Sequence, residues 1–61
     1  MKYLIAYTVN GRKNAKRHVY SIGGRRVYFD SLEQALNFTE FFNKQRYNVE
    51  VLTANWKKVE L

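Results

Sequence analysis

The 61-residue chain has no cysteine and no proline, and it contains one histidine and three glycines. Without cysteine there is no disulfide framework, no thiolate metal site and no cysteine nucleophile. A single histidine also excludes a histidine-rich metal cluster. The scarcity of proline and glycine predicts continuous structure without a linker. We therefore expect one domain spanning residues 1–61, with no cofactor and no metal.

Acidic residues and long apolar runs are scarce as well. Five Asp and Glu stand against eleven Lys and Arg, which gives a net charge of +6. No segment approaches the roughly 18 apolar residues of a membrane-spanning helix, and residues 1–9 lack the pattern of a signal peptide. These absences predict a cytoplasmic protein without a membrane partner. The charge predicts an anionic partner.

The positive charge is concentrated in the first half of the chain. Residues 1–30 contain seven Lys and Arg against Asp30, a net charge of +6, whereas residues 31–61 contain four against four Glu and are neutral. Six of the seven lie in two short segments: Arg12, Lys13, Lys16 and Arg17 in the first, and Arg25 and Arg26 in the second. This asymmetry indicates a local binding surface more clearly than the total charge does.

Alternating apolar and polar residues predict four β-strands. The hydrophobic content of 46% and the aromatic content of 16% favour a folded domain. The alternation covers residues 3–9, 17–22, 25–29 and 47–53. Gly23 and Gly24 predict a two-residue hairpin turn, because both central positions of such a turn require positive φ. Residues 56–61 either extend the fourth strand or add a short edge strand.

The strand register follows from the apolar pattern. A tight turn at Asn10 and Gly11 would place the apolar face of the first strand opposite polar residues. A wider loop instead pairs Tyr7 with His18, Ile5 with Tyr20 and Tyr3 with Ile22, and the glycine turn then pairs Tyr20 with Val27 and His18 with Phe29. We favour the wider loop, because it gives one continuous apolar face. Residues 10–16 then form a projecting basic loop.

A single helix is predicted after the third strand. Ser31 is a good N-cap residue, and Gln34 completes a capping box. One face of the helix is apolar and consists of Leu32, Ala35, Leu36, Phe38, Thr39 and Phe42. Lys44 and Arg46 suit the negative end of the helix dipole. The predicted fold class is α+β, a small antiparallel β-β-β-α-β sheet with one helix on one face.

The titratable residues do not form a catalytic pattern. General acid–base catalysis needs a positioned pair of such groups, but His18 and the five acids are scattered along the chain. We interpret His18 as a structural residue under the helix or at the sheet edge. We interpret Asp30 as a residue that stabilises the helix start. We therefore expect no catalytic residue and no enzymatic activity.

The basic segments predict nucleic-acid binding. Arg17 and Arg26 are expected near each other on the sheet face away from the helix, a face that also carries Leu4, Val19 and Tyr28. Arginine beside an aromatic ring contacts phosphates and stacks on bases. The candidate nucleic-acid-binding residues are Arg12, Lys13, Lys16, Arg17, Arg25, Arg26 and Tyr28. The alternative is that these charges serve solubility and protect sheet edges.

Three segments carry a resemblance to a known family: Tyr-Leu-Ile-Ala-Tyr at residues 3–7, a Gly-Arg-Lys loop, and residues 27–38. Over about residues 3–43 the chain resembles the arm-type DNA-binding domain of tyrosine integrases. The helix start of that family is matched by Phe29, Ser31, Gln34 and Ala35. The resemblance implies a three-stranded sheet that enters the major groove, with Arg12, Arg17, Arg26 and Tyr28 reading or positioning the DNA. The chain departs from the family in the strand at residues 47–53 and in having no recombinase domain, so integrase activity is not expected.

Aromatic residues support a second hypothesis, a protein-binding module. Ten aromatic residues are many for one helix to cover. The candidate interface residues are Phe41, Trp56, Val59 and Leu61. They would join two copies into a homodimer, in the style of a phage or mobile-element protein that inhibits a host defence protein. Alternatively, Trp56 folds over the helix end and Phe41 packs under the C-terminal segment. Our main hypothesis is a non-enzymatic, homodimeric module that binds nucleic acid, with DNA favoured over RNA.

Overall fold

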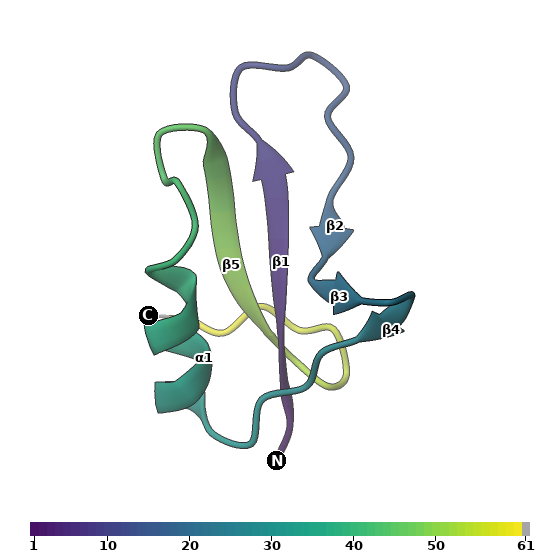
Figure 1. Cartoon of the computed structure of the whole chain (residues 1–61), viewed down its shortest axis with the longest axis vertical. Helices are drawn as coiled ribbons and strands as arrows, with labels where there is room; N and C mark the ends of the chain where they lie inside the picture. The colour runs from purple at the N-terminus through teal and green to yellow at the C-terminus, as the bar shows by residue number, and fades with distance from the viewer. Residues whose placement is uncertain (61) are drawn as a thin grey trace.

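A computed structural model describes residues 1–60, so the interface predicted at Leu61 lies outside the described residues. It confirms the α+β fold class, with a three-stranded antiparallel sheet, a two-stranded hairpin and one helix (Figure 1). The elements are β1 (Tyr3–Val9), β2 (His18–Val19), β3 (Ser21–Ile22), β4 (Arg25–Arg26), α1 (Leu32–Thr39) and β5 (Tyr47–Thr53). Among these residues, no helix is long and apolar enough to cross a membrane.

Strand β1 lies at the centre of the main sheet, between β2 and β5. It pairs with β5 over its whole length, from Tyr3 opposite Thr53 to Val9 opposite Tyr47. The main sheet therefore consists of β2, β1 and β5, and not of the first three strands. Because side chains alternate along a strand, β1 supplies core residues to both faces. Ile5 and Val51 are buried on the helix side, and a second buried group on the other side contains Leu4, Ala6 and Leu52.

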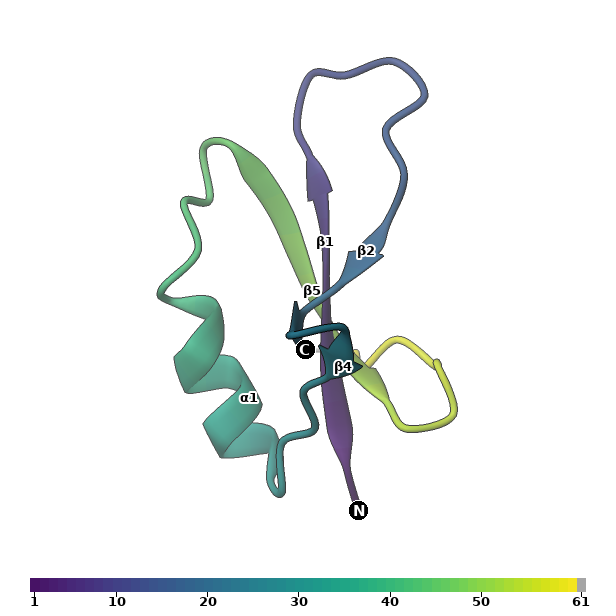
Figure 2. The same cartoon turned by 45° about the vertical axis from the view of Figure 1, so that its right-hand side comes forward.

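The wider register between the first two strands is confirmed. Tyr7 lies opposite His18, and the Tyr20 backbone N–H donates to the Ile5 carbonyl at 2.8 Å. The loop at residues 10–17 therefore projects beyond the sheet (Figures 1 and 2). Burial of the Tyr7 and Ile5 face against the helix explains why the tight turn is not used.

The predicted register is wrong at two pairs, one between the first and second predicted strands and one between the second and third. Tyr3 does not pair with Ile22, and His18 does not pair with Phe29. Instead Tyr3 and Phe29 exchange two backbone hydrogen bonds, of 2.9 and 2.8 Å. The chain thus leaves the edge of β1 after Tyr20 and returns to it at Phe29.

Between these two points, β3 and β4 form a separate hairpin that projects sideways from the sheet (Figure 2). The predicted glycine turn is confirmed, since Gly23 and Gly24 have φ of +59° and +80°. The predicted pairing of Tyr20 with Val27 is confirmed by a 3.1 Å backbone hydrogen bond. This path lets the larger Phe29 ring pack in the helix-side core and leaves Ile22 63% exposed.

The start and the apolar face of helix α1 are as predicted. Ser31 caps the helix, and its Oγ accepts a 3.1 Å hydrogen bond from the Gln34 backbone N–H. The predicted face packs on Ile5 and Val51, and it comprises Leu32, Ala35, Leu36, Phe38, Thr39 and Phe42.

The helix ends earlier than the position of its predicted C-terminal cations. Its last residue is Thr39, and no basic residue lies in its last turn. Beyond it, the N–H groups of Phe41 and Phe42 bond to carbonyls three residues back, which tightens the chain into a turn. Lys44 and Arg46 therefore lie outside the reach of the helix dipole, and this prediction was wrong.

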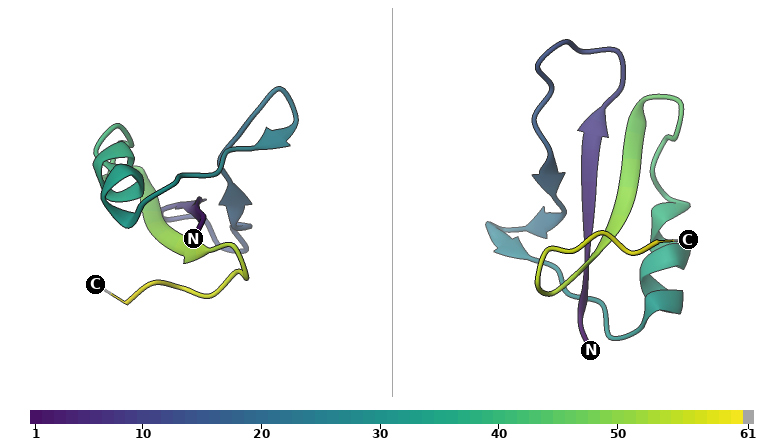
Figure 3. Two further views of the ribbon diagram at one scale, coloured as in Figure 1. Left: turned by 90° about the horizontal axis from the view of Figure 1, so that it is seen from below. Right: turned by 180° about the vertical axis from the view of Figure 1, so that it is seen from behind.

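The C-terminal segment returns along β5. A turn ending at Trp56 leads to hydrogen bonds between residues 57–59 and 51–53, with Leu52 bridged to Lys58. Of the two predicted alternatives, the short edge strand is the closer description. The segment crosses behind β5 and β1 in the view of Figure 1 (Figure 3), and Val59 near its end packs against the helix-side core. Leu4, expected on an open face, is fully buried in the group with Ala6 and Leu52.

Candidate nucleic-acid interface

The loop between β1 and β2 carries four exposed cations. Three of them, Arg12, Lys13 and Lys16, form no ion pair within residues 1–60. A shallow hollow of about 290 Å³ is lined by Arg12, Lys13, Asn14, Ala15, Lys16 and His18. Gly11 and Asn14 have φ of +77° and +67°, so the loop turns twice and brings its basic side chains around one hollow.

A second loop, at residues 40–46, is hydrogen-bonded to Asn10 at the base of the first loop. The Asn10 backbone N–H donates to the Arg46 carbonyl at 2.7 Å, and the Asn10 Nδ2 lies 3.5 and 3.4 Å from the carbonyls of Lys44 and Gln45. Both loops lie at the same end of the sheet (Figure 1). The Arg46 backbone is therefore held beside the base of the first loop, and we call Arg12, Lys13, Lys16 and Arg46 the basic end.

Sequence reasoning missed Arg46 because it lies in the electrically neutral half of the chain. Its guanidinium is 5.8 Å from the Tyr47 ring centroid, and it has no carboxylate partner within residues 1–60. Lys44 differs, since its Nζ lies 3.4 Å from the Glu40 carboxylate. Pairing the first predicted strand with the last would have placed Arg46 beside Asn10, but no local signal in the sequence specifies that pairing.

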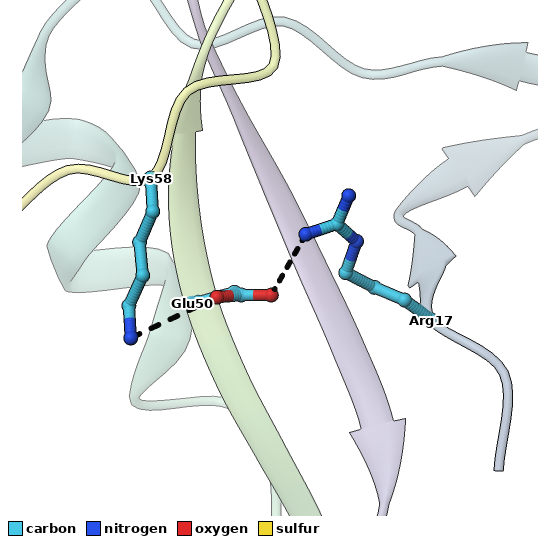
Figure 4. A network of polar contacts seen from close by, with 3 residues as sticks. All are labelled: Arg17, Glu50 and Lys58. Carbon is cyan, nitrogen blue, oxygen red and sulfur yellow. Dashed lines mark hydrogen bonds and ion pairs between the residues drawn. The ribbon is translucent and has the colours of Figure 1, made fainter. Parts of the chain in front are cut away.

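Arg17 lies next to the basic loop, but its charge is paired within the chain. Its guanidinium reaches across β1 to the Glu50 carboxylate at 3.4 Å, and Lys58 approaches the same carboxylate at 4.0 Å (Figure 4). Glu50 lies opposite Ala6, so this group is on the sheet face away from α1, where Arg17 was expected. Arg17 is therefore less available to an outside anion than the basic end.

Arg25 and Arg26 belong to the projecting hairpin. The Arg26 guanidinium lies 4.7 Å from the centroid of the Trp56 ring, which is cation–π distance. Arg25 is exposed and forms no ion pair within the described residues. The hairpin leaves the sheet near Ile5, about 17 Å along β1 from the basic loop. The basic residues thus form two groups, with Arg17 and Arg26 held by different partners.

The candidate aromatic and interface residues differ in exposure. Tyr28 is 49% exposed, Phe41 83% and Trp56 40%, whereas Val59 packs in the helix-side core. Phe41 contacts Phe38 at the helix end, with ring centroids 5.5 Å apart. The predicted packing of Phe41 under the C-terminal segment and of Trp56 over the helix end was wrong, because Phe41 faces solvent and Trp56 stacks on the hairpin.

His18 and the acidic residues do not gather into one group within residues 1–60. His18 is exposed on edge strand β2, with its ring centroid 5.6 Å from that of Tyr7, which confirms the predicted sheet-edge position. A hydrogen bond from the Lys2 ammonium, and then its charge, lower the pKa of the exposed Asp30 carboxyl. Within residues 1–60, no three His, Asp or Glu side chains gather in an arrangement that would hold a metal ion.

No protein-family model, curated protein or solved structure matches this chain. The resemblance to the arm-type domain of tyrosine integrases stays a prediction. What the geometry offers chemically is a set of exposed cations at one end of the sheet and an arginine–aromatic group at its side.

Proposed function

We propose that the protein is a non-enzymatic module that binds nucleic acid, with the basic end contacting backbone phosphates. One observation carries the proposal: the four exposed cations of the basic end lie on two loops at the same end of the sheet, and none has an acidic partner within residues 1–60. Lys and Arg side chains supply most contacts of proteins to phosphate oxygens, and these contacts position the protein on the nucleic acid.

The placement of the acidic residues supports the same proposal. Asp30 is paired with Lys2 and Glu40 with Lys44, while Glu50 receives both Arg17 and Lys58. These carboxylates are partly neutralised and leave the loop cations unopposed. The projection of the loop beyond the sheet gives it access to a phosphate backbone without a clash with α1 (Figure 1). The resemblance to the integrase domain favours DNA as the partner.

A pair of double variants tests the proposal. Lys13→Gln with Lys16→Gln removes two charges from the basic end, and Lys2→Gln with Lys58→Gln removes two cations that are already paired with carboxylates, as a matched control. Each lost phosphate contact reduces the slope of log K against log salt by about 0.9 for duplex DNA. We expect fluorescence anisotropy to show a slope reduced by nearly two in the first variant and little change in the control.

Two results would contradict the proposal. One is the absence of binding to duplex and single-stranded DNA and RNA at low salt. The other is an equal loss in both double variants, which would indicate a response to net charge alone and not to the basic end.

A second candidate function is protein binding through the end of α1. Phe41 is 83% exposed and rests against Phe38, which itself contacts Tyr20 and Phe29 in the helix-side core. An aromatic ring exposed to this extent beside a core opening is a typical interface anchor. We propose a second copy of the chain as its partner, with a host protein as the alternative.

A further inference from the structure

We propose that Trp56, Arg26 and Tyr28 form a platform on which unpaired bases of a single-stranded nucleic acid stack. We call these three residues the stacking platform. The inference rests on the proposed nucleic-acid binding and adds to it a second contact and a preference for single strands. The platform is distinct from the basic end, since it lies on the hairpin and the C-terminal turn.

The first component is the stack of Arg26 on Trp56. The Arg26 guanidinium is 4.7 Å from the indole centroid, and Trp56 as a whole residue is 40% exposed. An arginine–aromatic pair of this kind offers a planar, positively charged surface. Bases stack on such surfaces irrespective of their identity, because every base has a π-face.

The backbone holds Trp56 in place. Trp56 has a φ of +67°, a left-handed conformation that bulky residues rarely adopt. The turn is fixed by Thr53, whose carbonyl accepts from the Trp56 N–H at 2.9 Å and whose N–H donates to the Lys57 carbonyl at 2.8 Å. A strained residue that persists at the surface indicates a functional position. Here the strain presents the indole to the hairpin.

Tyr28 extends the platform along the same face. The Val27 N–H donates to the Tyr20 carbonyl, and the Phe29 N–H donates to the Tyr3 carbonyl. The chain from Val27 to Phe29 is therefore extended. Phe29 packs in the helix-side core, and alternation therefore places Tyr28 on the opposite side, as it does Arg26. Residues two apart along an extended chain are about 7 Å apart. Backbone spacing therefore places the exposed Tyr28 about 7 Å along the chain from Arg26, and we include it in the platform on this ground.

Charge favours a nucleotide over an apolar ligand. Arg25 and Lys57 flank the platform in sequence, both are exposed, and neither forms an ion pair within residues 1–60. They supply cations for the phosphates of a strand whose bases stack on the rings. In a duplex the base faces are already stacked on one another, so only unpaired bases reach the platform.

The spacing of the two sites sets a length requirement. Phe29 and Thr53, the neighbours of Tyr28 and Trp56, both pair with Tyr3, so the platform and Asn10 at the base of the basic loop are about 24 Å apart along β1. A stacked strand rises about 3.4 Å per nucleotide, so about seven nucleotides span this distance. Shorter oligonucleotides reach one site only and are expected to bind more weakly.

The test compares an oligothymidine of about twelve nucleotides, which is long enough to span both sites, with a duplex of the same length. For the Tyr28→Leu variant, we expect affinity for oligothymidine to fall about five-fold or more, the typical loss when one stacking ring is removed. Affinity for the duplex should stay within about two-fold. Tyr28→Phe keeps the ring and serves as the matched control. Trp56 is the only tryptophan, so its fluorescence in the wild type should change when oligothymidine binds.

Three results would overturn the proposal, and they separate it from the proposed function. If duplex binds and oligothymidine leaves Trp56 fluorescence unchanged, the platform fails and phosphate binding stands. An aromatic surface that receives protein side chains would give this result. If Tyr28→Leu weakens both ligands equally, the platform again fails alone. If neither ligand binds at low salt, both proposals fail.

Discussion

At the scale of single residues, seven of the sixteen Lys, Arg, Asp and Glu side chains form ion pairs within residues 1–60. Lys2 pairs with Asp30, Lys44 with Glu40, and Glu50 with two cations. These pairs lie at the surface, where an ion pair contributes about 0–1 kcal/mol. Their main effect is therefore on binding, because they determine which cations remain available to an outside anion.

The Lys2–Asp30 pair gives a direct electrostatic prediction. The Lys2→Met variant should raise the pKa of the Asp30 carboxyl toward its ordinary value, because Lys2 is the main cause of its lowered pKa. A folded-state pKa below the unfolded value means that the pair stabilises the fold above about pH 3.9. This contribution is lost as the pH falls through the folded-state pKa. NMR titration of the Asp30 carboxyl checks the prediction, and an unchanged pKa in the variant would contradict it.

At the scale of elements, α1 depends on its cap and its packing. It has eight residues, fewer than the roughly 12–15 that an isolated helix needs in water. Aromatic residues in its last turn and beyond its end compensate, since the rings of Phe38 and Phe42 both contact Tyr20. The short helix and these rings together close one face of the sheet.

Removal of the cap should destabilise the whole chain. Ser31→Ala deprives the Gln34 N–H of its acceptor and should lower the free energy of unfolding by about 1 kcal/mol. In a domain of this size, that corresponds to a midpoint lower by roughly 4–8 °C in thermal unfolding followed by circular dichroism. Ser31→Asp keeps an acceptor and is the control. Equal midpoints for the wild type and the alanine variant would show that the cap contributes nothing.

Elements defined by local signals could be predicted from the sequence. The cap at Ser31, the turn at Gly23 and Gly24, and the register of β1 with β2 each follow from turn chemistry or from one apolar face. The departure of the hairpin from the sheet did not follow, because it depends on Phe29 displacing Ile22 from the core. The Arg26–Trp56 contact joins side chains 30 positions apart in the sequence, and Arg46 reaches the basic end only through Asn10. Pairings of this range have no local signature.

At the scale of the whole molecule, three candidate surfaces lie at different places. The basic end lies beyond the sheet, the stacking platform lies at the hairpin, and Phe41 projects from the end of α1. A nucleic acid and a second copy of the chain could therefore be bound at different surfaces.

Self-association is expected to depend on Phe41. Sedimentation velocity at micromolar concentration should show a dimer for the wild type and a monomer for Phe41→Ser, because the exposed ring is the proposed anchor. Tyr28→Ser removes an exposed ring from the other face of the sheet and should leave the dimer intact. A monomeric wild type at this concentration would exclude the proposed homodimer.

The pairing of β1 with β5 has a consequence for the order of folding. The central strand of the sheet comes from residues 3–9, and its longest partner comes from residues 47–53. A ribosome must therefore make almost the whole of this segment before Ile5 and Leu4 can be covered. Contacts so distant in sequence close large loops and slow the folding of a small domain. Until β5 emerges, the apolar first strand is exposed to chaperones and to other nascent chains.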